Sequence, residues 1–187
     1  MSGPLPFPDR AALRAWLDAH AATEPELLVL GHKVATGRPS VVWEDCVIEA
    51  LRVGWIDGVR RSAGSEAWVQ RLCPRRPRSS WSARNVAHAE RLIAMGEMTE
   101  AGLRQVEAAR ADGRWAAAYA GPAEMEIPAD FLAALEERPL ARATFATLNR
   151  QNLYAIYHRL HTAKRPETRA RRLEVLLATL DRGERFH

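Results

Sequence analysis

Residues 55–72 are the part of this sequence that most constrains its fold. Residues 55–59 and 67–72 are rich in β-branched and aromatic side chains, which are typical of strands. The residues between them, Ser-Ala-Gly-Ser at 62–65, form a short polar stretch of the kind that closes a hairpin. Two strands joined so closely pair antiparallel. Because helical periodicity lies on both sides, the sequence predicts an α+β fold for this part of the chain.

Helix signals divide the chain into two regions. Helices are expected after Asp9, over 43–53, from Ser82 and from Thr99, and a further strand is expected over 26–34. From residue 128 onward the pattern is helical throughout. We therefore predict an α+β domain at 1–113, a linker at 114–127 and a helical module at 128–187. The linker is short, so we expect both parts to fold as one cooperative unit.

A basic segment at 73–85 precedes the helix that Ser82 is expected to cap. It carries four arginines: Arg75, Arg76, Arg78 and Arg84. Pro74 and Pro77 are expected to hold the segment extended. Arginine forks beside a helix N-terminus form a plausible anion site. Pairing of these arginines with carboxylates elsewhere in the chain is the open alternative.

A second basic cluster at 164–172 opens the last helix, in which Pro166 is expected at the first position. The cations of this cluster that we expect to bind a ligand are Lys164, Arg165 and Arg169. Positive charge in a first turn opposes the helix dipole, so an anion should offset it. That anion is either Asp57 or an external ligand. We predict that both clusters lie on the same side of the molecule, with Asp57 at salt-bridge distance from one of their arginines.

Charge and cysteine content bound the class of protein. The formal net charge is +4, and only two of the 27 basic residues are lysines. This charge favours anionic partners without naming one. Residues 1–20 form an amphipathic pattern and not a signal peptide, and no run approaches the ~18 apolar residues of a membrane span. Cys46 and Cys73 match no zinc or redox spacing, so we expect free thiols and a cytoplasmic location.

Several phrases in the chain resemble one family. They are Gly54-Trp-Ile-Asp57, Pro74-Arg-Arg-Pro-Arg-Ser-Ser-Trp-Ser82, Gly96-Glu-Met-Thr-Glu-Ala-Gly102, Asp112-Gly-Arg-Trp115 and Ala163-Lys-Arg-Pro-Glu-Thr-Arg169. Together they resemble the YdeI/OmpD-associated, or bacteriocin-protection, family over nearly the whole chain. The N-terminal part is similar to the YjbR/CyaY-like superfamily, which implies helices on one face of a small antiparallel sheet. The resemblance implies no reaction, cofactor or catalytic residue.

Motifs of enzymes and metal sites are missing from the sequence. It has no nucleophile elbow, no Ser-x-x-Lys and no phosphate-binding glycine loop. His158 and His161 are three residues apart on one expected helix, but no acid or cysteine joins them at ligand spacing. We therefore predict no catalytic residue, no metal and no cofactor, and we favour a protein that is not an enzyme.

The function expected from these features is binding of an anionic ligand or macromolecule through a joint basic surface. Its predicted residues are Asp57, Arg75, Arg76, Arg78, Trp81, Lys164, Arg165 and Arg169. Trp81 beside the arginines could stack on a base, so weak, salt-sensitive binding to single-stranded nucleic acid is a further expectation. The alternatives are an enzyme acting on a phosphorylated or carboxylated small molecule and a protein–protein adaptor. The family label adds stress or antimicrobial-peptide resistance. The oligomeric state stays open.

Overall fold

The computed structural model describes residues 3–186, and the chain divides into two compact units, 1–117 and 118–187. The elements of the first unit follow in chain order: β1 (Leu5–Pro6), α1 (Arg10–His20), β2 (Leu27–His32), the short 3-10 helix η1 (Val34–Thr36), α2 (Trp43–Arg52), β3 (Trp55–Ser62), β4 (Ala67–Pro74), α3 (Ala83–Ala94) and α4 (Glu100–Ala111).

The sheet of the first unit has four strands in the order β1-β2-β4-β3. The predicted hairpin is present as β3 and β4, which pair antiparallel with Asp57 opposite Leu72. β4 also pairs antiparallel with β2. β1 is parallel to β2, so the sheet is mixed. The α+β fold class is confirmed. A strand of two residues that includes a proline has no periodic pattern, and β1 was for that reason not expected.

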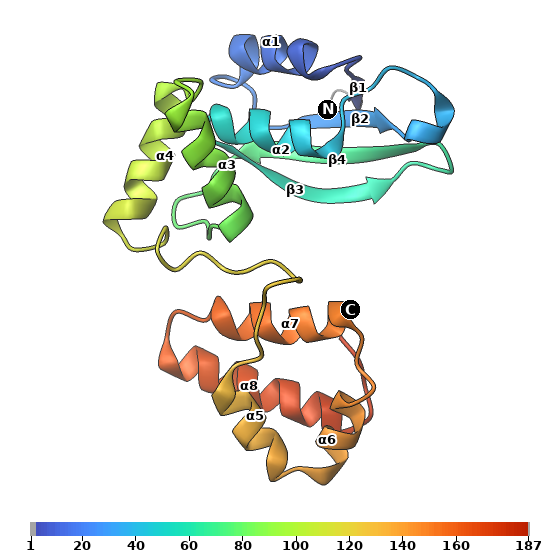
Figure 1. Ribbon diagram of the computed structural model, residues 1–187, viewed down its shortest axis with the longest axis vertical. Helices are drawn as coiled ribbons and strands as arrows, with labels where there is room; N and C mark the ends of the chain where they lie inside the picture. Colours follow the sequence, from blue (N-terminus) through green and yellow to red (C-terminus); the bar gives the residue numbers. More distant parts are fainter. Residues whose placement is uncertain (1–2, 187) are drawn as a thin grey trace. The chain divides into compact units, whose positions relative to one another are not determined.

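Helices α1 and α2 cover one face of this sheet (Figure 1). Side chains of a strand alternate between faces, and Val29, Trp55 and Leu72 point toward the helices. They form a buried core with Leu13 and Leu17 of α1. The helices begin where their caps predict, because the side chains of Asp9, Ser82 and Thr99 each accept a hydrogen bond from a backbone N–H of the first turn.

A buried carboxylate joins α1 to α2. Glu49 is 0% exposed and accepts hydrogen bonds from Arg10 (Nε to Oε1, 2.6 Å), Arg14 (Nη2 to Oε1, 2.9 Å) and Arg52 (Nε to Oε2, 2.8 Å). Burial acts to raise the pKa of Glu49, but these three guanidinium groups outweigh it and the pKa is lowered. Glu97 also pairs with Arg14. The network holds Arg10 in a fixed orientation at the start of α1.

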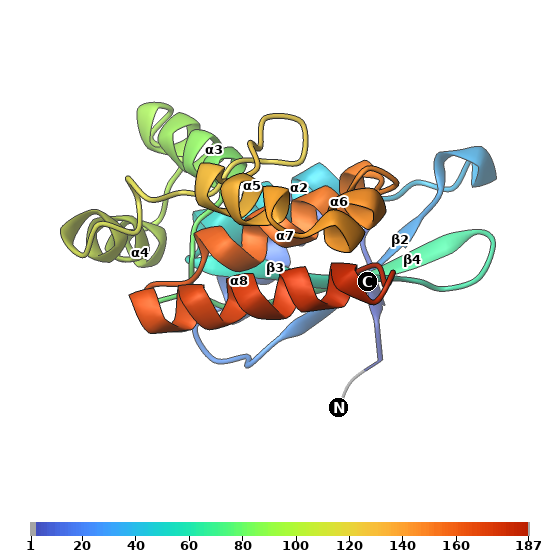
Figure 2. The same cartoon turned by 90° about the horizontal axis from the view of Figure 1, so that it is seen from below.

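The second unit is helical and consists of α5 (Ala129–Glu136), α6 (Pro139–Phe145), α7 (Arg150–His161) and α8 (Pro166–Asp181). Pro166 is the first residue of α8, as the sequence predicts, and the long α8 packs against α6 and α7 (Figures 1 and 2). Its core is separate from that of the first unit and includes Phe131, Ile156, Leu176 and Leu180. Among residues 3–186, no helix combines the length and apolar composition that a bilayer crossing requires.

Candidate functional site

The first basic motif forms a tight turn and not the extended segment that its prolines predict. The N–H of Ser79 donates to the carbonyl of Arg76 at 3.1 Å, with Pro77 and Arg78 between them. Arg78 has φ 65°, a left-handed conformation that is uncommon for a residue with a side chain. Proline followed by a residue with positive φ is the signature of a type II turn. Proline restricts the backbone angles of the residue before it, whereas this turn depends on the positive φ of Arg78, the residue after Pro77.

Arg75 anchors the turn from inside. Its side chain is buried, 6% exposed, and the guanidinium lies 3.7 Å from the centre of the Trp81 ring. Nη1 donates to the carbonyl of Ser80 at 3.2 Å. A cation over a buried indole face is stabilised by the ring quadrupole. The role of Arg75 in this geometry is to hold the turn, and its guanidinium is turned away from solvent.

Trp81 lies beneath the same turn and is 2% exposed. Its ring packs against that of Trp115, with 4.8 Å between the centroids. Arg114 also stabilises the turn, since its Nη1 donates to the carbonyl of Ser79 at 2.8 Å. The sequence predicts that Trp81 offers a surface on which a base could stack. Burial between Arg75 and Trp115 argues against that role.

Arg76 and Arg78 point outward beside a hollow of about 380 Å³. The hollow is also lined by Arg71 and Cys73 of β4 and by Ser79. Arg71 pairs with Glu26 (Nε to Oε2, 2.7 Å). Within residues 3–186, Arg76 and Arg78 make no ion pair with a carboxylate. The turn therefore presents two guanidinium groups that make no ion pair with any carboxylate of the described part of the chain.

Asp57 lies on the opposite side of the sheet from this hollow. Its neighbours on β3, Ile56 and Gly58, line the hollow, and alternation along the strand turns Asp57 toward α3. Burial raises the pKa of Asp57, while the charges of Arg75 and Arg84 and a hydrogen bond with Asn85 act to lower it. Asp57 therefore faces the inner side of the motif, where Arg75 is, and not the exposed Arg76 and Arg78.

The second basic cluster is divided in the same way between paired and exposed cations. Arg169 pairs with Asp130 (Nη2 to Oδ1, 2.9 Å), and Arg172 donates to the carbonyl of Arg159 at 2.7 Å near the end of α7. Lys164 and Arg165 are exposed. A cation at a helix C-terminus suits the dipole, which explains the contact of Arg172. This cluster belongs to the second unit, and its placement beside the first cluster stays a prediction.

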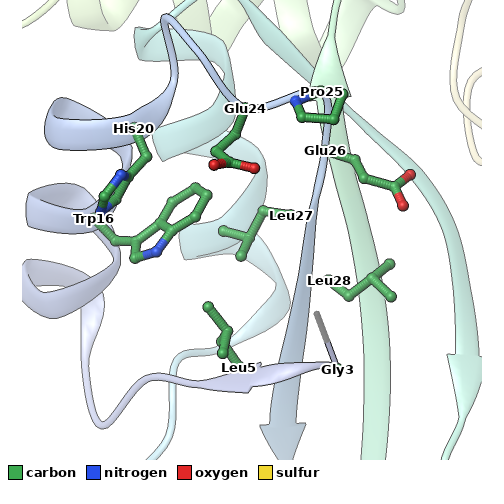
Figure 3. Close-up of a pocket in the computed structure, with 9 residues that line it drawn as sticks. All are labelled: Gly3, Leu5, Trp16, His20, Glu24, Pro25, Glu26, Leu27 and Leu28. Carbon is green, nitrogen blue, oxygen red and sulfur yellow. The ribbon is translucent and has the colours of Figure 1, made fainter. Parts of the chain in front are cut away.

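A different hollow, of about 320 Å³, lies between α1 and β2 (Figure 3). The rings of Trp16 and His20 of α1 pack at an angle of 43° with 4.8 Å between their centroids, and the carboxylate of Glu24 lies on the same side of β2 as the Trp16 ring. Glu26 points to the other side of the strand in this view. With Glu24 at its rim and no arginine or lysine in its lining among the described residues, this hollow does not suit an anion.

Sequence reasoning missed Arg71, Cys73 and Arg114. The signal for Arg71 and Cys73 is the alternation of β4, where the buried Gln70 and Leu72 place their neighbours on the outer face. Arg114 lies in the phrase Asp112-Gly-Arg-Trp115, but its contact with Ser79 spans 35 residues and has no local signal.

The histidines of α7 have aromatic neighbours. His158 packs against Tyr119 with 4.8 Å between the ring centroids, and burial lowers its pKa. His161 packs against Tyr157 at 5.2 Å. Over the described part of the chain, no three histidine, cysteine, aspartate or glutamate side chains gather in a way that could hold a metal ion. His158 is half-buried among these rings, whereas His161 is exposed and contacts Tyr157 at the surface.

Comparison with known proteins separates the two halves of the chain. Residues 5–105 match the family described as "Domain of unknown function (DUF8412)". Residues 124–183 match the family described as "Bacteriocin-protection, YdeI or OmpD-Associated". The expected YdeI/OmpD-associated resemblance is thus confirmed for the C-terminal helices, whereas the N-terminal part matches a different family. No curated protein and no solved structure gives a significant match.

Proposed function

The chain belongs to the family of the domain of unknown function DUF8412 and carries a YdeI/OmpD-associated region after it, and from this premise we propose that it is a binding protein for anionic ligands. The observation that carries the proposal is the pair Arg76 and Arg78. Both are exposed and lie on a turn that is held from inside. Neither has an ion pair within the described residues.

The turn is suited to binding because its shape exists before a ligand arrives. Arg114 donates to the carbonyl of Ser79 at the end of the turn, Arg75 donates to that of the following Ser80, and Pro77 restricts the backbone of the turn. A preformed turn loses little conformational entropy on binding, so more of the interaction energy appears as affinity. Guanidinium forks match the oxygens of phosphate and carboxylate groups. The proposed ligands are therefore anions that present phosphate or carboxylate oxygens to Arg76 and Arg78.

Binding is favoured over the enzymatic alternative by the chemistry of the hollow. Its charged lining residues are arginines, which keep their protons and cannot act as general acids or bases. Within the described residues, no histidine, aspartate or glutamate lines it beside the thiol of Cys73 and the hydroxyl of Ser79. For these reasons a reaction on a phosphorylated or carboxylated small molecule is the weaker proposal.

A YjbR/CyaY-like relationship of the first unit is supported by the antiparallel β2-β4-β3 strands with α1 and α2 on one face. A cytoplasmic location is supported by the free thiols of Cys46 and Cys73. The adaptor role in stress resistance rests on the family label.

The joint basic surface is a further part of the proposal. Lys164 and Arg165 are exposed cations of the second unit and could extend the site formed by Arg76 and Arg78. A ligand that spans both clusters would be a macromolecule with repeated negative charges, such as single-stranded nucleic acid. A ligand that uses the first cluster alone would be a small anion.

The test is titration of the full chain with inorganic pyrophosphate and with a single-stranded oligonucleotide. Replacing Arg76 and Arg78 together by alanine should lower the affinity at least tenfold, or about 1.4 kcal/mol. For the oligonucleotide, the salt dependence should become shallower by about 0.7 in log–log slope for each phosphate that the variant no longer binds. Arg104→Ala is the matched control, because Arg104 is an exposed arginine of α4 outside the hollow.

The outcomes separate the possibilities. Equal binding by the wild type and the Arg76→Ala/Arg78→Ala variant would overturn the proposal. If Lys164→Ala with Arg165→Ala weakens oligonucleotide binding as much as the first pair does, the surface is joint. If that pair has no effect while Arg76→Ala/Arg78→Ala does, the ligand uses the first cluster alone.

A further inference from the structure

A second hollow with basic side chains lies where α1, α2 and α3 come together, outside the turn described above. It has a volume of about 220 Å³ and is lined by residues of all three helices and of the segment that follows α3. Three of its lining residues are apolar: Ile48, Leu92 and Met95. A water molecule takes about 30 Å³ of liquid volume, so the hollow has room for a ligand of a few heavy atoms.

The unpaired imidazole of His88 is the first feature that points to a ligand here. Its side chain lines the hollow and is 6% exposed. Its Nδ1 is buried and has no hydrogen-bond partner among the described residues, and its Nε2 is 3.8 Å from the Glu44 carboxylate, beyond hydrogen-bonding distance. A buried polar atom without a partner costs about 1–3 kcal/mol. Burial closes Nδ1 off from the hollow, whereas Nε2 is not buried and makes no hydrogen bond within residues 3–186, so Nε2 is the nitrogen that a ligand here can contact.

The charges around the hollow are the second observation. Arg10 and Arg91 contribute two guanidinium groups, against the single carboxylate of Glu97. Arg10 is held by Glu49, and its Nη2 is 3.9 Å from Glu97, so its position does not depend on a ligand. Arg91 is exposed and makes no ion pair or hydrogen bond through its side chain within residues 3–186. It can therefore turn toward a ligand without breaking an existing interaction.

Glu97 is already used by other arginines. Its carboxylate pairs with Arg14 and lies near Arg10, as part of the network around the buried Glu49. Among the described residues that line the hollow, the carboxylate of Glu97 is the one negative group; it is thus largely neutralised, and the positive charge of Arg91 is left over. This excess positive charge would repel a cationic ligand and attract an anionic one.

We propose that this hollow binds a small monocarboxylate, with the carboxylate held by Arg10 and Arg91 and hydrogen-bonded by His88, and with the alkyl part against Ile48, Leu92 and Met95. A guanidinium fork matches a carboxylate in geometry and charge. The apolar lining offers nothing to an inorganic phosphate but contacts an alkyl chain. The site is distinct from the turn of Arg76 and Arg78, and its ligand need not be the same.

The protonation of His88 supplies an independent readout. Burial lowers the pKa of His88, and the charges of Arg91 and Arg84 on α3 lower it further, while Glu44 on α2 raises it. Arg10 on α1 and Glu97 after α3 are the other charged groups of the lining. A carboxylate placed beside the ring would favour the protonated form. Binding should therefore shift the titration of His88 to higher pH.

The experiment is an NMR titration of the full chain that follows the imidazole signals of His88, with butyrate as the probe and butylammonium as the probe of opposite charge. Butyrate should shift the signals with saturation and raise the pH of their midpoint, and butylammonium should do neither. Arg91→Ala should raise the butyrate Kd at least tenfold. Arg91 is exposed, so this variant should fold as the wild type does.

The controls distinguish this site from the proposed function. Arg104→Ala and the Arg76→Ala/Arg78→Ala pair should leave butyrate binding unchanged, and Arg91→Ala should leave pyrophosphate binding unchanged. The inference is overturned if butyrate leaves His88 unaffected, if butylammonium binds equally well, or if Arg91→Ala retains the wild-type Kd. Loss of butyrate binding in the Arg76→Ala/Arg78→Ala pair would also overturn it, because the two sites would then be one.

Discussion

Glu49 and Asp57 are two carboxylates of the first unit whose pKa values move in opposite directions. Burial acts to raise the pKa of both. At Glu49, hydrogen bonds from Arg14, Arg10 and Arg52 more than compensate, and the pKa is lowered. At Asp57 the favourable charges do not outweigh burial, and the pKa is raised. Burial acts the same way on both carboxylates, so the sign of each pKa shift depends on how strongly the neighbouring groups stabilise the charged form.

Replacing Glu49 by glutamine should destabilise the protein by about 3–5 kcal/mol at neutral pH, because the buried Arg52 and the partly exposed Arg10 and Arg14 lose their shared counter-charge. A lowered pKa contributes stability that is present above the unfolded value, ordinarily 4.5, and is lost as the pH falls through the folded value. The difference between wild type and Glu49→Gln in urea unfolding should therefore shrink below about pH 4.5. A difference that stays constant from pH 7 to pH 3 would contradict this account.

Asp57→Asn should show the opposite pH dependence. A raised pKa contributes stability that is present below the unfolded value, ordinarily 3.8, and is lost as the pH rises through the folded value. Relative to Asp57→Asn, the wild type should lose stability as the pH rises. At pH 7 we expect the two to differ by no more than about 1 kcal/mol in urea unfolding. A loss of several kcal/mol at pH 7 would show that pairing with Arg75 outweighs burial.

At the scale of an element, the turn at 76–79 keeps an arginine in a conformation that favours glycine. Arg78→Gly should stabilise the protein by up to about 1 kcal/mol in urea unfolding, because glycine adopts a positive φ without steric cost. The same change should weaken pyrophosphate binding by removing an exposed guanidinium. Arg76→Gly is the matched control, since Arg76 has no positive φ, and it should weaken binding without any gain in stability. A loss of stability in Arg78→Gly would show that the side chain itself holds the turn.

The elements that sequence reasoning found are those with local signals. The hairpin at 55–72 follows from strand composition, and the starts of α1, α3, α4 and α8 follow from Asp9, Ser82, Thr99 and Pro166. The two-residue strand β1 has no such signal and depends on its pairing with β2. A local pattern therefore predicts an element when the residues that stabilise it are close in sequence.

The candidate site was predictable as a segment but not residue by residue. Arg75 and Arg76 are adjacent and chemically identical, and yet one is buried over Trp81 and the other is exposed. What separates them is the turn at Arg78 and the contact of Arg114, which comes from 35 residues away. The network of Glu49 likewise joins residues far apart in the sequence, with 39 positions between Arg10 and Glu49 and 83 between Arg14 and Glu97. Long-range contacts of this kind leave no trace in the local sequence.

At the scale of the whole molecule, the two units have separate hydrophobic cores. One is built around Leu13, Leu17 and Trp55, and the other around Phe131 and Leu176. The sequence predicts, from its short linker, that both parts unfold together. Separate cores favour the opposite outcome, because each unit buries apolar surface of its own and can expose it without the other.

Calorimetry of the full chain should therefore show two transitions. At about 0.7 kcal/mol per residue, units of 117 and 70 residues should contribute unfolding enthalpies of about 80 and about 50 kcal/mol near 60 °C. Phe131→Ala removes a ring that is 0% exposed in the second core and should cost about 3–5 kcal/mol, so it should lower or abolish the smaller transition alone. Leu13→Ala is the counterpart in the first core and should lower the larger transition alone. If both variants shift one shared transition, the expectation from the short linker is correct, and anion binding at Arg76 and Arg78 would then be coupled to the fold of the YdeI/OmpD-associated region.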